Sequence, residues 1–165
     1  MADINVFDNQ RNSEFQEEIV QVNRVSKKTK GGNKIGFSVL TVVGNKNGKV
    51  GVGLGKAPDV ASAIKKGVAI AKKHAIDVPI VRGTIPFEFY IKLGAAKIIL
   101  KPAPTGSGVI AGGAVRSVVS LAGIQNISSK VLGTKNQASN VYATIEALKR
   151  LALRYEREKK NYGTK

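Results

Sequence analysis

The sequence predicts an α+β fold of two small domains, an N-terminal β-β-β-α domain and a C-terminal β-β-α-β-α domain. Three observations support this prediction. Short runs of β-branched residues are interspersed with stretches of helical periodicity. A connector containing Pro79, Gly83 and Pro86 interrupts the chain near its middle. Hydrophobic residues make up 42% of the 165 residues, an ordinary share for a chain with a packed core.

The charge is distributed unevenly along the chain. The formal net charge is +16, from 27 Lys and Arg against 11 Asp and Glu. The first 18 residues hold five acidic residues and one basic residue, so the remainder carries a net +20. We expect residues 1–16 to form a flexible acidic tail. The charge of the folded body has two interpretations: a surface that binds nucleic acid, or a basic surface that only keeps the protein soluble. So large an excess of positive charge in so short a chain favours nucleic acid.

Three strands and one helix are expected in the first domain, residues 17–80. Residues 27–34 contain four lysines and a Gly-Gly pair, which is typical of a loop. The turn NKNG, residues 45–48, indicates a hairpin. Alternate glycines at Gly51, Gly53 and Gly55 predict the close approach of another backbone, from protein or RNA. The strands are expected at 19–25, 35–44 and 49–57.

A helix is expected to begin at Pro58 and to run to about residue 74. At about 100° per residue, four lysines fall on one side of it and the apolar residues on the other. A cationic stripe favours contact with phosphate over a merely solvated face. This β-β-β-α order is the layout of a double-stranded-RNA-binding module without its first helix. The four lysines are Lys65, Lys66, Lys72 and Lys73.

The second domain is expected at residues 81–155, followed by a frayed end at 156–165. One helix is expected within 109–123, where Gly123 is well placed to end it. A second, long helix is expected over 137–158, where apolar residues recur at helical spacing. Strands are expected at 87–93, 96–102 and 124–132.

Catalysis finds little support in the sequence. Residues 106–111 have the G-x-G-x-x-A spacing of dinucleotide-binding loops, but no acidic residue lies between Glu88 and Glu146 to bind a ribose. The glycines fit a tight loop, or a helix start near 111–114 that binds an RNA phosphate or a protein carboxylate. With no Cys and a single His, thiolate and His-rich metal sites are excluded. We therefore expect no enzyme, cofactor, metal or small-molecule substrate.

Targeting signals are not evident either. No run of 18 apolar residues occurs, so no transmembrane helix is expected. The N-terminus is polar and acidic, unlike a secretory signal or a transit peptide. We expect a soluble, cytoplasmic protein.

Two long segments carry a resemblance to a known family. They are VNRVSKKTKGGNKIGFSVLTVVGNKNGKVGVGLGKAPDV and GAAKIILKPAPTGSGVIAGGAVRSVVSLAGIQNISSKVLGTKNQASNVYATIEAL. Together they resemble the bacterial small ribosomal subunit protein five family. The resemblance implies a double-stranded-RNA-binding-like first domain and a location in the small ribosomal subunit. It further implies binding to small-subunit rRNA and to ribosomal proteins four and eight, a place at the head–body junction, a part in translational accuracy and proximity to mRNA at the entry channel.

The resemblance also assigns residues. It implies that the loop at 25–32 reaches rRNA and influences spectinomycin sensitivity, and that a second loop with Arg116 contacts protein four. The second set is Thr105, Gly106, Ser107, Gly108 and Arg116. Adding the basic residues near that first loop, along the sheet and on the helix, we expect rRNA to be bound by Arg24, Ser26, Lys27, Lys28, Thr29, Lys30, Gly31, Gly32, Lys34, Lys49, Lys56, Lys65, Lys66, Lys72 and Lys73.

Two alternatives remain open at this point. One is a free-standing double-stranded-RNA-binding regulator or RNA chaperone. The other is a nucleotide-dependent enzyme that uses the glycine loop at 106–113.

Overall fold

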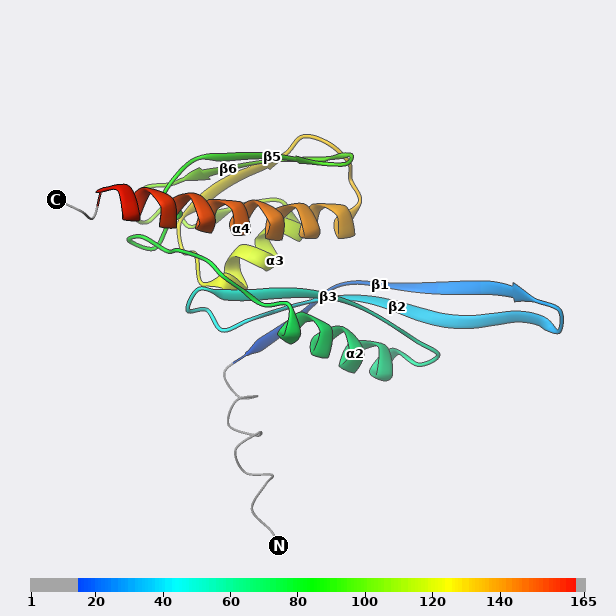
Figure 1. Ribbon diagram of the computed structural model, residues 1–165. Coiled ribbons are helices and arrows are strands. Elements are labelled where there is room, and N and C mark those ends of the chain that lie inside the picture. Colours follow the sequence, from blue (N-terminus) through cyan, green and yellow to red (C-terminus); the bar gives the residue numbers. More distant parts are fainter. Residues whose placement is uncertain (1–14, 163–165) are drawn as a thin grey trace, which may run out of the picture.

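Four layers of secondary structure make up the computed structural model, which describes residues 15–162 (Figure 1). The outermost layer on one side is helix α2 (Val60–Lys73), and a four-stranded antiparallel sheet follows it. Helices α3 (Gly113–Ala122) and α4 (Gln137–Tyr162) form the third layer, and a second four-stranded sheet covers them. The first sheet has the order β1 (Gln16–Thr29), β2 (Gly32–Gly44), β3 (Lys49–Ala57), β4 (Ile76–Asp77). The second has the order β5 (Phe89–Leu93), β6 (Ala96–Pro102), β8 (Ile127–Val131), β7 (Val109–Ile110).

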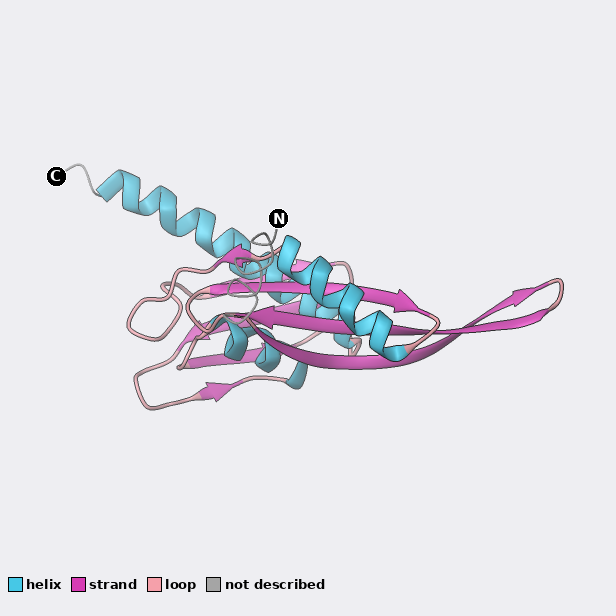
Figure 2. Cartoon of the chain, turned by 90° about the horizontal axis from the view of Figure 1, so that it is seen from below, coloured by secondary structure: helices cyan, strands magenta, loops and turns pink. Residues whose placement is uncertain are grey.

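The alternate glycines of β3 receive helix α2. A Cβ atom at Gly51, Gly53 or Gly55 would overlap a carbonyl oxygen of α2, at Ala71, Gly67 and Ala63 respectively. The expected close approach is therefore made by the protein's own helix and not by RNA. Figure 2 shows α2 lying along the strands of this sheet.

The central part of the first sheet, in β2 and β3, is buried on both faces. Val39 and Val43 of β2 pack towards α2, whereas Leu40 and Val42 join a cluster with Val118 and other residues of α3, α4 and the second sheet. Alternating side chains of one strand thus serve two layers. Because that cluster contains residues of both domains, the two halves of the chain share one main core.

The prediction of a loop at residues 27–34 was wrong, because most of this segment is paired strand. Strand β1 continues to Thr29 and β2 begins at Gly32, so the turn has only two residues, Lys30 and Gly31. Regular antiparallel pairing continues out to Thr29 and Gly32 despite the lysines. The acidic tail expected at residues 1–16 extends one residue into β1, which begins at Gln16. Residues 1–14 of that expected tail lie outside the described part of the chain.

Helix α2 begins slightly later than expected. Pro58 precedes it, and Asp59 is the N-cap, whose carboxylate accepts from the Ser62 amide at 3.0 Å. A side-chain acceptor at this position satisfies one of the free amides of the first turn, which fixes the start of the helix.

Two further boundaries of the second domain were wrong. Val109 and Ile110 do not begin a helix; they form β7, which pairs in parallel with β8. Helix α3 starts only at Gly113, after Gly112 as its N-cap, and glycine is a poor helix former. Gly123 ends α3 in the left-handed conformation, at φ +91°, as predicted. Helix α4 continues to Tyr162, beyond its expected end at residue 158, and the frayed end at 156–165 stays a prediction.

Candidate nucleic-acid interface

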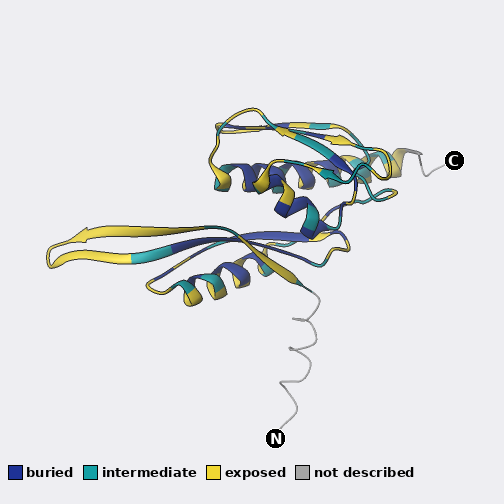
Figure 3. Cartoon of the chain, turned by 180° about the vertical axis from the view of Figure 1, so that it is seen from behind, coloured by how far each residue is buried: buried dark blue, intermediate teal, exposed yellow. Residues whose placement is uncertain are grey.

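A two-stranded ribbon projects from the first sheet beyond the body of the molecule (Figures 1 and 2). We call residues 24–34 the arm; all of them are exposed, as Figure 3 shows in yellow. The Thr29 hydroxyl donates to the Gly32 carbonyl at 2.8 Å across the turn, and Gly32 has φ +124°. The arm therefore holds a defined shape and brings together the expected residues Arg24, Ser26, Lys27, Lys28, Thr29, Lys30, Gly31, Gly32 and Lys34.

Two lysines of the arm face each other across the ribbon. Lys27 pairs with Lys34 in the register, so their side chains leave the same face at neighbouring positions. Like charges directly opposite each other destabilise a sheet. No acidic residue occurs between Glu18 and Asp59 to offset them from within this segment. A bound anion would remove this repulsion.

The base of the arm adjoins an open hollow of about 340 Å³. Lys27 and Lys34 line it together with Lys56, which comes from the end of β3. Val25 and Pro58 supply apolar parts of the wall. Three of the expected rRNA-binding lysines are thus assembled around one hollow, although they lie up to 29 positions apart in the chain.

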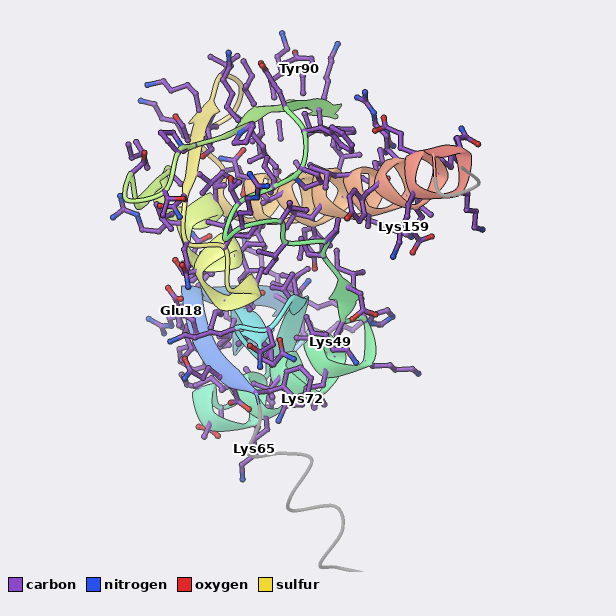
Figure 4. The ribbon with its side chains drawn as sticks, turned by 90° about the vertical axis from the view of Figure 1, so that its left-hand side faces the viewer. Glu18, Lys49, Lys65, Lys72, Tyr90 and Lys159 are labelled. Atoms are coloured by element: carbon purple, nitrogen blue, oxygen red, sulfur yellow. The ribbon has the colours of Figure 1, made fainter. Side chains whose placement is uncertain are left out.

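The lysines of α2 are not equivalent. Lys65, Lys66 and Lys73 are exposed. Lys72 is less so, with 26% of its side chain accessible, and its Nζ lies 3.1 Å from Glu17 Oε1 (Lys65 and Lys72 are labelled in Figure 4). A phosphate at Lys72 would compete with the Glu17 carboxylate of β1. The sequence did not predict this ion pair.

Lys49 lies apart from the arm. It begins β3, whereas Lys56 is near the end of the same nine-residue strand. At about 3.3 Å per residue, seven steps separate the two Cα atoms by roughly 23 Å. The Nζ atom of Lys49 is 4.0 Å from Asp77 Oδ1 on β4. The sequence places Lys49 with Lys56 among the expected rRNA-binding residues, but the two lysines lie at opposite ends of β3.

The glycine loop between β6 and β7 is anchored from within the protein. Asn126, which is 4% exposed, accepts from the amides of Gly106 at 2.9 Å and Gly108 at 3.2 Å through its Oδ1 atom. These are amides that a nucleotide phosphate would need, so the nucleotide-enzyme alternative loses its phosphate cradle. Thr105 and Gly106 are exposed at the tip, Ser107 and Gly108 are half-buried, and Arg116 is exposed on α3.

Sequence reasoning missed two features. The first is Asn126, for which no local pattern exists, because its partners lie 18 and 20 residues away. The second is a set of lysines on the uncovered face of the second sheet. Their signal was present in the alternation of FYIKL and AKIILKP, where Tyr90 and Lys92 in the first strand, and Lys97, Ile99 and Lys101 in the second, occupy every second position. The lysines are Lys92, Lys97, Lys101 and Lys130.

Other kinds of site are not supported by the described residues. Within residues 15–162, no three His, Cys, Asp or Glu side chains are grouped so that they could hold a metal ion. No helix in this part of the chain is long and apolar enough to span a membrane. An α+β protein whose basic residues occupy a projecting arm and a helix face has the character of an RNA-binding protein.

Comparison with known proteins gives the family. Residues 15–79 match the model of ribosomal protein S5, N-terminal domain, and residues 91–160 match that of ribosomal protein S5, C-terminal domain. The chain is 54% identical over 138 residues to a protein of Thermotoga neapolitana named small ribosomal subunit protein uS5, covering 84% of this chain and 78% of the relative. It is 51% identical to the protein of that name from Thermotoga maritima, with the same coverage. It is 50% identical over 140 residues to the one from Thermosynechococcus vestitus, covering 84% and 80%.

The chain therefore belongs to the ribosomal protein S5 family, whose members are structural, non-enzymatic constituents of the small ribosomal subunit. This confirms the predicted family, the two-domain α+β fold, the ribosomal location and the assignment as a non-enzyme.

Proposed function

We propose that this chain holds small-subunit rRNA with the arm and with the exposed side of α2. The observation that carries the proposal is the Lys27–Lys34 pair, which places two like charges opposite each other on an arm that contains no acidic residue. An RNA phosphate near this pair replaces repulsion with attraction on both sides.

The mechanism is neutralisation of phosphates with release of condensed counterions. Lysines supply the charge as flexible point cations. Gly31 and Gly32 have no neighbouring atom within 4 Å of where a Cβ would stand, so the turn leaves room for a phosphate to come close to the backbone. Lys56 extends the same surface into the hollow at the base of the arm.

The cations of α2 and β3 contribute unequally in this proposal. Lys65, Lys66 and Lys73 meet RNA directly from the exposed side of the helix. Lys72 and Lys49 each lie near a carboxylate, Glu17 and Asp77, so RNA must compete with those partners. We expect these two lysines to add less to binding than the arm does.

A second part of the proposal concerns neighbouring proteins. We assign the contact with ribosomal protein four to Thr105, Gly106, Ser107, Gly108 and Arg116, because Asn126 holds this loop in one shape and Arg116 is exposed. Through this contact the chain takes part in translational accuracy. The proposal also includes contact with ribosomal protein eight, a place at the head–body junction and proximity to mRNA at the entry channel. It further includes an influence of residues 25–32 on spectinomycin sensitivity, and domain limits at 17–80 and 81–155.

The RNA part is tested by the salt dependence of binding. We expect Lys28→Gln with Lys30→Gln to weaken binding to small-subunit rRNA and to reduce the slope of log K against log salt by roughly two units, at about 0.9 for each lost phosphate contact. Lys149→Gln with Lys159→Gln is the matched control, because it removes the same charge from exposed positions of α4. An unchanged slope in the arm variant, or an equal change in the control, would show that the arm does not bind RNA.

The ribosomal assignment has its own experiment, which also addresses the alternative of a free-standing regulator. We expect the chain to co-sediment with small-subunit particles after a salt wash. A pool found entirely free of particles would contradict a structural role.

The accuracy part of the proposal is tested at Arg116. We expect Arg116→Leu to raise miscoding in a reporter strain without lowering the stability of the isolated chain. Unchanged miscoding would remove Arg116 from the proposal.

A further inference from the structure

The second sheet has one face that no other layer covers. Helices α3 and α4 pack on its inner face, where Ile91, Ile98 and Leu100 are buried. In Figure 3, no helix or strand of residues 15–162 lies on the outer side of this sheet. We call it the open sheet face and define it by Tyr90, Lys92, Lys97, Ile99, Lys101 and Lys130.

The register places an apolar centre inside a ring of cations. Ile99 of β6 is half-buried and lies opposite Tyr90 on β5 and opposite Lys130 on β8. Lys97 and Lys101 stand two residues to either side of Ile99 on the same strand, and therefore on the same face. Tyr90 is 54% exposed, and among the large hydrophobic residues described as exposed only Ile110 has a larger exposed fraction. Figure 4 shows Tyr90 at the outer edge of the molecule, on the side of the sheet away from α4.

The charge of this face is almost uncompensated. No Asp or Glu occurs from residue 89 to residue 145, so strands β5 to β8 contain none. Glu88 pairs with Lys101, at 3.1 Å between Oε1 and Nζ. Lys92 lies directly opposite Lys97, a second like-charged pair across neighbouring strands, which costs stability in the absence of an anion.

We propose that the open sheet face binds a single-stranded segment of RNA, with a base stacked on Tyr90 and phosphates held by Lys92, Lys97 and Lys130. An exposed aromatic ring beside spaced cations on a sheet fits single strands, because their bases present free π-faces and their backbone carries the charge. In a duplex the bases are already stacked, so Tyr90 and Ile99 would have no partner. An acidic protein surface would match the cations but would give the tyrosine ring no base to stack on.

This site is separate from the one in the proposed function. The arm belongs to the first sheet, and α3 and α4 lie between the two sheets (Figure 1). RNA can therefore be bound on both sides of the molecule at once. The experiment below reads out a probe at residue 90, so its result does not depend on the arm.

The chain contains no tryptophan, which makes a local fluorescent probe possible. In the full chain, Tyr90→Trp places a single indole on the open sheet face, and Tyr142→Trp places one on α4 as the control, at a residue that is 40% exposed. The probes are a 12-nucleotide oligouridylate, a 12-base-pair RNA duplex and polyglutamate. We expect the oligouridylate to quench the emission of Tyr90→Trp and to leave that of Tyr142→Trp unchanged.

The other outcomes overturn the proposal. Quenching of Tyr90→Trp by the duplex at equal or lower concentration would show that the face binds duplex RNA, and displacement of the oligouridylate by polyglutamate at equal charge would show a site for acidic protein. No quenching by any probe would show that the face is merely solvated.

Substitutions test the two contributions separately. We expect Tyr90→Ala to weaken binding of the oligouridylate roughly fivefold or more, since stacking of one base on an aromatic ring contributes about 1–3 kcal/mol. We expect Lys92→Gln with Lys97→Gln to lower the salt slope by roughly 1.4, at about 0.7 for each contact with a single strand. Lys149→Gln with Lys159→Gln on α4 is again the matched control. If all three variants bind alike, the open sheet face is not the site.

Discussion

The backbone amide of Lys46 donates a hydrogen bond of 2.9 Å to the carbonyl oxygen of Leu121, which ties the β2–β3 turn to the last turn of α3. The amide of Gly48 donates to Ala122 in the same way, at 2.8 Å. Gly123 follows with φ +91°, and a Cβ atom there would overlap the Lys46 carbonyl. The two domains therefore meet backbone to backbone, at a position that favours glycine for its conformation and for its size.

Gly123→Ala tests this junction. We expect it to lower the free energy of unfolding by about 1–3 kcal/mol, because alanine is strained at positive φ and its methyl group pushes the two domains apart. Urea denaturation followed by circular dichroism measures the change. Gly113→Ala is the control, since nothing lies within 4 Å of its Cβ position and α3 begins there. Equal losses in the two variants would contradict the role of the junction.

Gly53→Ala tests the packing of α2 on the first sheet. The new methyl group would overlap the Gly67 carbonyl, and the helix must move away to admit it. We expect a loss of about 1–3 kcal/mol of stability, the usual range for an overpacked interior. Gly31→Ala, where the Cβ meets nothing within 4 Å, is expected to leave the urea midpoint nearly unchanged. A midpoint for Gly53→Ala equal to that of the unmodified chain would show that α2 is loosely seated.

Asn126→Ala tests the anchoring of the glycine loop. The substitution leaves the amides of Gly106 and Gly108 without their acceptor, and we expect about 1–3 kcal/mol of destabilisation. The specific readout is hydrogen exchange, in which these two amides should lose protection while those of β6 keep theirs. Gln125→Ala, at the exposed neighbouring position, is the control. Retained protection in Asn126→Ala would mean that the loop keeps its shape by other contacts.

The Asp59 cap gives the stability of α2 a dependence on pH. The Ser62 backbone amide is the main cause that holds the pKa of the Asp59 carboxyl below its ordinary value of 3.8. A carboxyl whose pKa is lowered by folding stabilises the folded state above its unfolded pKa, and this contribution is lost as the pH falls through the folded pKa. We expect Asp59→Asn, which keeps a cap but does not titrate, to be less sensitive than the unmodified chain to acid below about pH 4. Parallel acid-unfolding curves for the two proteins would refute the effect.

Local pattern was sufficient for most of the elements. The glycines of β3 predicted a close backbone approach, and Gly123 predicted the end of α3; both follow from the properties of glycine alone. Residues 27–34 were misjudged because lysines and glycines are typical of loops, whereas cross-strand pairing extends both strands to a two-residue turn. Val109 and Ile110 form a strand only because β8, 18 residues later, is available as a partner.

For the candidate site, the sequence could locate the cations but not their neighbours. The arm lysines lie close together because they are close in the chain. The carboxylate beside Lys72 comes from Glu17, a residue of β1 more than 50 positions earlier, and no periodicity could have indicated it. Register decides that Lys92 faces Lys97 and that Tyr90 stands beside Ile99, so the open sheet face became visible only once the strands were paired.

The shared core has a consequence for the order in which the protein folds. Leu40, Val42, Val50 and Val52 are buried against residues that include Val115 and Val118 of α3, which a translating ribosome adds about 60 residues after β3. At about 5–20 residues per second, the nascent first domain exposes this apolar face to solvent for several seconds. Its hairpins and α2 can form in that interval, but their final packing must await synthesis of α3. Maturation of the first domain is thereby coupled to synthesis of the second.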